Sequence, residues 1–294
     1  MTNSSSLFHN AFTISCRGRI VDLLEPKVMG IINLTPDSFY RASRTPVSLV
    51  VDKAGDMLLQ GAAFLDLGGY SSRLGATDIS IQEETDRVVP AIEAVVNAFP
   101  DAIISVDTFR AAVAEASIVA GASIVNDISA GDLDNEMLKM VARHQAPYIM
   151  MHMRGTPQNR QQFTQYDHLE LEVLEYFSQR IAVARAAGIN DIILDPGFGG
   201  FSKTVEQNFE LLRNLKGLSI TGLPLLVGVS RKSMVTKTLG ISSQDALNGT
   251  TALHALALNN GAKILRVHDV REAVQTVALF KAYSGDFQIW KGSI

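Results

Sequence analysis

The stretch IISVDTFRAAVAEASIVAGASIVNDI, residues 103–128, contains one complete strand–helix–strand unit. It begins with a short, mainly apolar run that ends at Asp107. Residues 110–120 then have the length and composition of a helix that stops at Gly121, and a second apolar run follows at residues 123–128. Such runs, joined by a helix, are typical of parallel strands that are covered on both faces. The stretch therefore predicts a βα unit of a parallel sheet.

The same alternation recurs along the whole chain. Short β-branched or aliphatic runs, each ending at a polar residue or glycine, lie at residues 28–35, 64–69, 103–108, 123–128, 147–153, 191–197, 224–230 and 264–269. Helices are predicted over residues 48–60, 110–120 and 169–187 and over a stretch ending near Asn260, and glycine follows each of them. Eight repeats in a chain of 294 residues predict an α/β fold of the (β/α)8 TIM-barrel type. A doubly wound open sheet is the alternative, but it usually has fewer strands.

The N-terminal segment precedes the first barrel strand. Residues 12–23, FTISCRGRIVDL, alternate like a β-hairpin, and we expect this hairpin to cap the bottom of the barrel. Residues 1–11 are expected to form a flexible tail. No linker composition marks a boundary after it, so residues 12–294 are expected to form a single domain.

Composition and charge exclude several classes of protein. The chain is 47% hydrophobic and 19% charged, which fits a globular protein with a large aliphatic core. A formal net charge of -4 argues against a nucleic-acid or anionic-membrane surface. The single cysteine, Cys16, cannot form an intramolecular disulfide. We see neither a secretory leader nor a membrane-length apolar run, so a cytoplasmic location is expected.

Polar residues stand at the ends of these apolar strands. In a TIM barrel the carboxyl ends of all strands converge on one mouth, where the chemistry takes place. An aspartate after a strand is often only a helix N-cap, and Asp107 taken alone fits that interpretation. Because all eight strand ends carry such residues, the pattern favours a site for a polar ligand.

These residues sort into two chemical groups. Asp107, Asn126 and Asp195 offer carboxylate and amide groups, which suit a flat heterocycle with parallel N–H donors. Arginine forks and an imidazole suit a phosphate or diphosphate, and the second group supplies them: Arg73, Arg266 and His268, with Arg231 and Lys232 as further candidates. The residues alone thus indicate a polar flat ring beside a polyphosphate.

Asn33 and Asp37 add hard oxygen ligands near the end of the first strand. Oxygen donors of this kind suit Mg²⁺ shared with phosphate oxygens. Other motifs are absent from the sequence: GVSRKS at 228–233 is not a P-loop, and DPGFGGFSK at 195–203 is not a dinucleotide-binding loop. There is no HExxH zinc motif and no GxSxG nucleophile elbow.

Read as strings, the strand ends resemble the dihydropteroate synthase family. The matching motifs are MGIINLTPDSF (29–39), GGYSSRLGA (68–76), ISVDT (104–108), VNDI (125–128), MHMRGTP (151–157), LDPGFG (194–199), GVSRKS (228–233) and RVHD (266–269). They occur in the family order and cover nearly the whole chain from about residue 17. Agreement among several unrelated motifs makes the resemblance highly specific.

The resemblance implies a reaction and a set of roles. The amine of p-aminobenzoate attacks the methylene of 6-hydroxymethyl-7,8-dihydropterin diphosphate, giving 7,8-dihydropteroate and pyrophosphate, through an SN1-like displacement. The implied pterin-holding residues are Asp107, Asn126, Asp195 and Lys232, with Met151 packed on the ring; Asn33 meets Mg²⁺, and Ser72, Arg73, Arg266 and His268 address the diphosphate. Asp37 and Phe39 belong to a first loop that closes over the site, and Ser72 and Arg73 to a second. The implied catalytic residues are Asp37, Lys232, Arg266 and His268.

This chain departs from the family pattern at three places. The family usually has Glu-Ser-Thr-Arg-Pro where this chain has the five residues from Tyr70 to Leu74. The loop after Phe39 lacks the usual glycine, and an extra Gly200 separates Gly199 from the next aromatic residue. These changes bear on p-aminobenzoate affinity and on the family's sensitivity to sulfonamides.

Two other functions stay open from the sequence. A pterin-binding methyltransferase would share the carboxylates but would have no use for the phosphate-type motifs. The other is a paralogue that binds pterin with weak or no synthase activity, because the sequence does not show whether the two altered loops still close over the site. The family also implies a homodimer through late helices, and the apolar residues 252–258 are compatible with that.

Overall fold

The computed structural model describes residues 12–35, 47–71 and 77–285. Eight parallel strands close into a barrel in the order β10-β3-β4-β5-β6-β7-β8-β9. These strands are β3 (Lys27–Asn33), β4 (Phe64–Gly68), β5 (Ile104–Asp107), β6 (Ile124–Asp127), β7 (Tyr148–Met151), β8 (Ile192–Asp195), β9 (Leu225–Val227) and β10 (Ala262–Val267). The predicted TIM barrel is confirmed.

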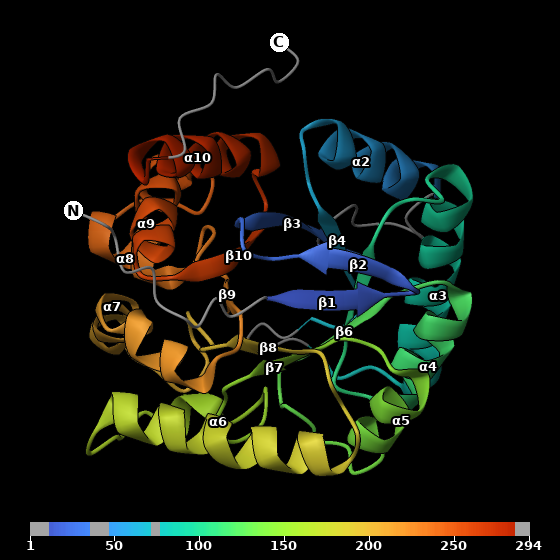
Figure 1. Ribbon diagram of the computed structural model, residues 1–294, viewed down its shortest axis with the longest axis horizontal. Helices are drawn as coiled ribbons and strands as arrows, with labels where there is room; N and C mark the ends of the chain where they lie inside the picture. Colours follow the sequence, from blue (N-terminus) through green and yellow to red (C-terminus); the bar gives the residue numbers. More distant parts are fainter. Residues whose placement is uncertain (1–11, 36–46, 72–76, 286–294) are drawn as a thin grey trace, which may run out of the picture.

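Helices surround the barrel on its outside (Figure 1). The α-helices are α2 (Val47–Leu59), α3 (Ile81–Ala98), α4 (Ala111–Ala120), α5 (Met137–His144), α6 (Leu169–Ala186), α7 (Val205–Arg213), α8 (Ser233–Leu239), α9 (Leu247–Asn259) and α10 (Val270–Tyr283); the 3-10 helices are η1 (Arg160–Gln162) and η2 (Leu215–Thr221). The predicted glycine stops are present, and Gly121 ends α4 with a φ of 119°. Among the described residues, no helix is both long and apolar enough to cross a membrane.

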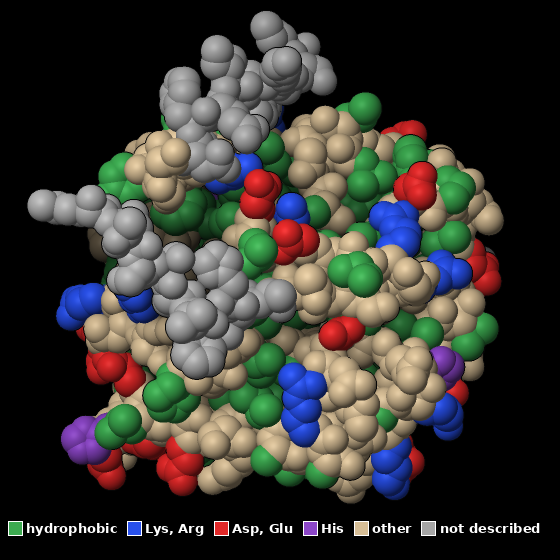
Figure 2. Space-filling view, in the orientation of Figure 1, with side chains coloured by type: hydrophobic (Ala, Val, Ile, Leu, Met, Phe, Trp, Pro, Cys, Tyr) green, Lys and Arg blue, Asp and Glu red, His purple; other side chains and the backbone are tan. Residues whose placement is uncertain are grey.

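The N-terminal hairpin closes one end of the barrel. It consists of β1 (Thr13–Cys16) and β2 (Arg19–Asp22), and it lies across the centre of the ring of helices in Figure 1. Its buried residues Ile14 and Cys16, together with Leu23, join an apolar cluster that takes one residue from or next to every barrel strand. The predicted bottom cap is therefore confirmed. On the same face, acidic and basic side chains are interspersed (Figure 2).

The barrel interior has two tiers. The bottom tier is apolar: Met29, Phe64, Ile103, Ile124, Ile149, Ile193, Leu226 and Ile264. Because side chains in a strand alternate between faces, the next inward residue lies two positions further along. This rule places Asp66 above Phe64, Asn126 above Ile124 and Arg266 above Ile264. The upper tier is therefore polar and opens towards the carboxyl ends of the strands.

The hydrogen-bonded strands are shorter than the apolar runs suggested. Residues 224–230 were predicted as a strand, but β9 ends at Val227, and β8 ends at Asp195 rather than at Gly197. The backbones diverge there, and a carboxylate or hydroxyl binds backbone N–H groups instead, as Asp195 does with Gly197. The residues after each strand thus become loops around the mouth.

The hairpin cap yields a stability prediction. Leu23 is fully buried in the bottom cluster, whereas Ile20 on the same hairpin is 77% exposed. We expect Leu23→Ala to lower the free energy of unfolding in urea by about 2–5 kcal/mol, because it leaves a cavity under the barrel. The matched change Ile20→Ala is expected to cost less than about 0.5 kcal/mol. Equal costs for the two variants would show that the hairpin is not packed into the core.

Candidate active site

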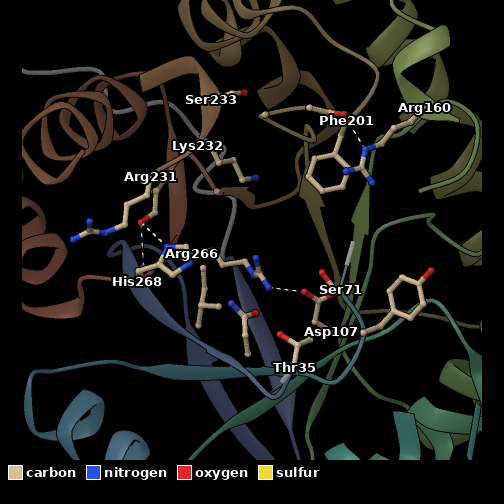
Figure 3. A pocket seen from close by; sticks show the side chains of 17 residues that line it. Thr35, Ser71, Asp107, Arg160, Phe201, Arg231, Lys232, Ser233, Arg266 and His268 are labelled. Atoms are coloured by element: carbon tan, nitrogen blue, oxygen red, sulfur yellow. Dashed lines mark hydrogen bonds and ion pairs between the residues drawn. The ribbon is translucent and has the colours of Figure 1, made fainter. Parts of the chain in front are cut away.

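A cavity of about 270 Å³ opens at the carboxyl ends of the barrel strands (Figure 3). Its lining residues come from strands and loops far apart in the sequence: Ile31, Asn33, Thr35, Tyr70, Ser71, Asp107, Arg160, Gly199, Gly200, Phe201, Gly228, Ser230, Arg231, Lys232, Ser233, Arg266 and His268. The predicted residues Asn33, Asp107, Lys232, Arg266 and His268 are thus brought together at one mouth.

The Arg266 guanidinium lies among carboxylates. Its Nε is 2.5 Å from Oδ2 of Asp66, and its Nη2 is 2.5 Å from Oδ2 of Asp107. Asn126 donates from Nδ2 to the same oxygen of Asp66 at 3.1 Å. Sequence reasoning had sorted Arg266 with the diphosphate group, apart from Asp107 and Asn126. In the structure these residues form one network, and Asp66 joins them.

Burial and the shared guanidinium act on the proton affinity of Asp107 in opposite directions. Burial raises the pKa of Asp107; Arg266 opposes this rise, and Asp66 adds to it. Burial alone would lower the pKa of Arg266, but the charges of Asp66 and Asp107 raise it above its ordinary value. Arg266 therefore stays charged, while the pair of carboxylates carries an excess of negative charge.

Asp195 and Lys232 provide a second acceptor and a cation. Asp195 is 5% exposed, and its Oδ1 accepts from the Gly197 N–H at 2.8 Å. Burial raises the pKa of Asp195, an effect that the charge of Lys232 opposes. The Lys232 Nζ donates to the Phe198 carbonyl at 2.7 Å, and burial lowers the pKa of Lys232 to about 8.

His268 and Ser230 form a neutral pair of hydrogen-bonding groups. Ser230 Oγ lies 3.1 Å from His268 Nδ1 and accepts from the His268 backbone N–H at 3.2 Å. The His268 side chain is exposed at the mouth, but partial desolvation of its ring and next the charge of Arg266 lower the pKa of His268 to about 4. Near pH 7 His268 is therefore a neutral imidazole that can donate a hydrogen bond, not a cation.

Arg231 does not serve the cavity with its guanidinium. Its Nε and Nη2 bind both carboxylate oxygens of Asp269 at 2.8 and 2.7 Å, and its Nη1 donates to the carbonyls of Ser243 and Gln244. In Figure 3 its side chain points away from Arg266. Arg231 thus links the GVSRKS and RVHD loops, and its role as a phosphate ligand stays a prediction.

Comparison with known proteins identifies the family. The model of the family described as "Pterin binding enzyme" matches residues 29–268. The dihydropteroate synthase of Synechocystis is 44% identical over 252 residues, 84% of this chain and 86% of the relative. The Yersinia pestis dihydropteroate synthase, solved in complex with a sulfonamide drug, has a TM-score of 0.88 at 42% identity, over 93% of this chain and all of that one. The Xanthomonas albilineans enzyme, solved with 4-aminobenzoic acid, has a TM-score of 0.87 at 37% identity, over 93% and 98%.

This chain belongs to the dihydropteroate synthase family. As a member of that family it is a transferase of folate biosynthesis, as the sequence motifs predicted. The family assignment thus identifies the class of reaction for the cavity, a transfer reaction of folate biosynthesis.

The loop after β8 is held by side chains from several elements. Cations or an amide donate to five successive carbonyls: Lys203 to Gly197 and Phe201, Lys232 to Phe198, Asn208 to Gly199, and Arg160 to Gly200. A glycine-rich loop has no ladder partners, so its polar backbone atoms need donors of this kind. A side chain at Gly197 would also collide with the His152 carbonyl, because its Cβ would lie 2.1 Å away. Sequence reasoning missed Lys203, Asn208 and Arg160.

These contacts fix an aromatic wall of the cavity. The Phe201 ring lies between Lys232, with Nζ 5.2 Å from the ring centroid, and Arg160, with Cζ 4.3 Å from it (Figure 3). Lys203 is buried, and its Nζ lies 2.8 Å from Nδ1 of His152. Burial lowers the pKa of His152 well below its usual value, with the charge of Lys203 next in effect. The loop after β8 is therefore supported by the buried Lys203, whose side-chain nitrogen faces the neutral imidazole of His152.

The other predicted site residues divide into two sets. Met151 is buried with Ile128 and Met153 against Phe201, so its contact with a pterin stays a prediction. Asp37, Phe39, Ser72 and Arg73 lie outside the residues that the structure describes. The missed residue Asp66 did have a signal in the sequence: it is the single charged residue inside the apolar run FLDLGG.

The loop clamp yields a prediction. We expect Lys203→Met to lower the free energy of unfolding in urea by about 1–3 kcal/mol, because the Gly197 carbonyl loses its donor and the Phe201 carbonyl keeps only the Ser202 hydroxyl. Amide hydrogen exchange at residues 197–203 should also become faster. The exposed residue Lys216 is the matched control, and Lys216→Met is expected to change stability by less than about 0.5 kcal/mol. Unchanged exchange in Lys203→Met would contradict the clamp.

Proposed function

We propose that the cavity binds 6-hydroxymethyl-7,8-dihydropterin diphosphate and p-aminobenzoate and joins them into 7,8-dihydropteroate with release of pyrophosphate. The observation that carries this assignment is one buried network beneath the mouth, in which Arg266 pairs with Asp66 and Asp107 and Asn126 donates to Asp66, with Lys232 and His268 on the rim. The relative solved with 4-aminobenzoic acid supports the choice of second substrate. A pterin-binding paralogue without synthase activity is not favoured, since the Synechocystis dihydropteroate synthase is 44% identical over 84% of the chain.

The buried acceptors suit the pterin ring. A pterin presents an amino group and ring N–H groups along one edge, and a carboxylate accepts two such donors in a planar fork. Asp195 and Asp107 supply carboxylates, and Asn126 supplies an amide that both donates and accepts. The excess negative charge around Arg266 is then neutralised by N–H donors of the ligand. Lys232 offers a cation on the rim for an oxygen of the ring.

The opposite side of the cavity suits the diphosphate. His268 and Ser230 offer neutral donors there. We propose that Arg73, outside the described residues, adds a guanidinium. The expected homodimer is also a proposal, and it fits the exposure of Leu256 on α9 and of Leu279 on α10.

Magnesium fits this site as a substrate-bound ion. No group of three His, Cys, Asp or Glu side chains that could hold a metal occurs in the described part of the chain. Mg²⁺ usually keeps several waters and uses one or two protein ligands plus phosphate oxygens. Asn33 lines the cavity and would serve as such a ligand, with Asp37 as a further candidate. When bound, the ion would offset the negative charge of the diphosphate.

We propose a dissociative displacement. The bond between the pterin methylene and the diphosphate oxygen breaks, and its electron pair leaves with pyrophosphate. The amine nitrogen of p-aminobenzoate forms the new carbon–nitrogen bond and loses one proton. Carboxylates around the dihydropterin stabilise the positive charge on the methylene. No protein side chain forms a covalent bond with the pterin in this scheme.

Turnover tests the proposed function. We expect pyrophosphate release to require both substrates and Mg²⁺, and intact-mass spectrometry during turnover to show no pterin–protein adduct. Asp195→Asn should lower kcat/KM about 100-fold, equivalent to about 2.7 kcal/mol, because a charged acceptor for the ring is lost. Asp191 stands at the opposite end of the same strand, where it binds the Ser15 N–H, so Asp191→Asn is the matched control and should retain activity. Binding of both substrates without pyrophosphate release would contradict the proposal.

Lys232 predicts a pH dependence. Burial lowers the pKa of Lys232 to about 8, so its ammonium is charged below about pH 8 and neutral above it. An ammonium attracts the diphosphate substrate more strongly than an amine does, so affinity should fall as the pH rises through about 8. Calorimetric titration with the pterin diphosphate between about pH 6 and pH 10 measures this, and Lys232→Met should bind weakly with this pH limb absent. A wild-type affinity that is flat across the range would remove Lys232 from the site.

A further inference from the structure

Asp66 occupies a special place in the barrel. It lies in the middle of β4, in register with Ile31 on one side and Ser105 on the other, and it is 1% exposed. Like Asn126 and Asp195, it is not among the residues that line the cavity, whereas its partner Arg266 is. Its short side chain is occupied by Arg266 and Asn126, so we expect its effect on a ligand to pass through these two residues.

One oxygen of Asp66 holds two side chains from different strands. Its Oδ2 accepts from Arg266 Nε at 2.5 Å and from Asn126 Nδ2 at 3.1 Å. Arg266 comes from β10 and Asn126 from β6, which lie two strands away from β4 on either side. Long side chains such as arginine have many rotamers, and a bond to a buried carboxylate selects one of them.

The burial of the Asp66 carboxylate costs free energy, and stability alone does not explain it. A buried carboxylate is expensive unless it is paired, and replacing a buried ion pair by apolar residues is often neutral for stability. Its second oxygen, Oδ1, has no hydrogen-bond partner among the described residues. Asp66 is therefore incompletely satisfied as a structural group, while it orients two residues that face the ligand.

We propose that Asp66 is a positioning residue for pterin binding, which sets the orientation of Arg266 and Asn126 without touching the pterin itself. This inference rests on the proposed pterin site. It differs from the roles of Asp107 and Asp195, which meet the ligand directly in the proposed function. Loss of Asp66 should weaken ground-state binding more than the chemical step, because the diphosphate-side groups keep their places.

The test compares Asp66→Asn with a matched buried aspartate. Asp127 is also buried, but its carboxylate is held by Tyr148 Oη at 2.6 Å and by the N–H groups of Ser129 and Gly131, on the side of β6 away from the cavity. Calorimetry with the pterin diphosphate alone gives Kd, and steady-state turnover gives KM and kcat. We expect Asp66→Asn to raise Kd and pterin KM at least 10-fold with kcat within about threefold, and Asp127→Asn to lower Tm without changing Kd.

A double-mutant cycle tests the route of the effect. If Asp66 acts through Arg266, Asp66→Asn should weaken binding much less in an Arg266→Met background than in the wild type. The double variant removes the charges of Asp66 and Arg266 together and leaves Asp107, whose pKa burial already raises to about 7, to take up a proton. Full additivity in the cycle, an unchanged Kd in Asp66→Asn, or an equal rise of Kd in Asp127→Asn would overturn the inference.

The two measurements separate this inference from the proposed function. The inference depends on pterin binding, which calorimetry follows without p-aminobenzoate. A wild-type protein that binds the pterin diphosphate but releases no pyrophosphate would contradict the proposed function and leave the Asp66 comparison valid. A wild-type protein that does not bind the pterin diphosphate would overturn both.

Discussion

The guanidinium of Arg266 is the group that allows a polar site to exist inside an apolar barrel. Asp66 and Asp107 would each be costly to bury alone, and Arg266 pairs with both at 2.5 Å. One cation cannot neutralise two carboxylates: burial raises the pKa of Asp107, Arg266 opposes this rise, and the charge of Asp66 offsets part of the effect of Arg266. A ligand with N–H donors completes this balance. The site is therefore pre-organised as an acceptor before any ligand arrives.

The alternation of side chains along the strands places this charge network. Phe64 and Asp66 are two residues apart on β4, yet one belongs to the sealed apolar tier and the other to the polar tier. The hairpin closes the lower tier, so that water is excluded from beneath the network. Electrostatic interactions above this floor are stronger than they would be in a solvated channel. The bottom cap, though remote from the chemistry, thus contributes to the strength of the binding site.

Sequence reasoning succeeded where the signal was periodic or local. The strand–helix rhythm predicted the barrel, and the polar residues after the apolar runs predicted one mouth, where Asp107 and Lys232 line the cavity. It failed where partners come from distant elements. The fork between Arg231 and Asp269 joins two motifs 38 residues apart, and the lowered pKa of His268 depends on partial desolvation and on the charge of Arg266, which no motif encodes. Asp66 was overlooked because it sits inside a strand rather than at its end.

The distribution of charge among the described residues has a consequence for the leaving group. Arg266 is engaged by two carboxylates, Arg231 is bound to Asp269, and His268 is neutral near pH 7. The diphosphate side therefore offers fewer available cations than its motifs suggested, although departing pyrophosphate gains negative charge. Stabilising that charge falls largely to groups that come with the substrate or from the loops, namely the proposed Mg²⁺ and Arg73. In the proposed reaction such a site would separate its two tasks: fixed groups of the barrel would bind the ring, and Mg²⁺ and Arg73 would complete the site when the diphosphate is present.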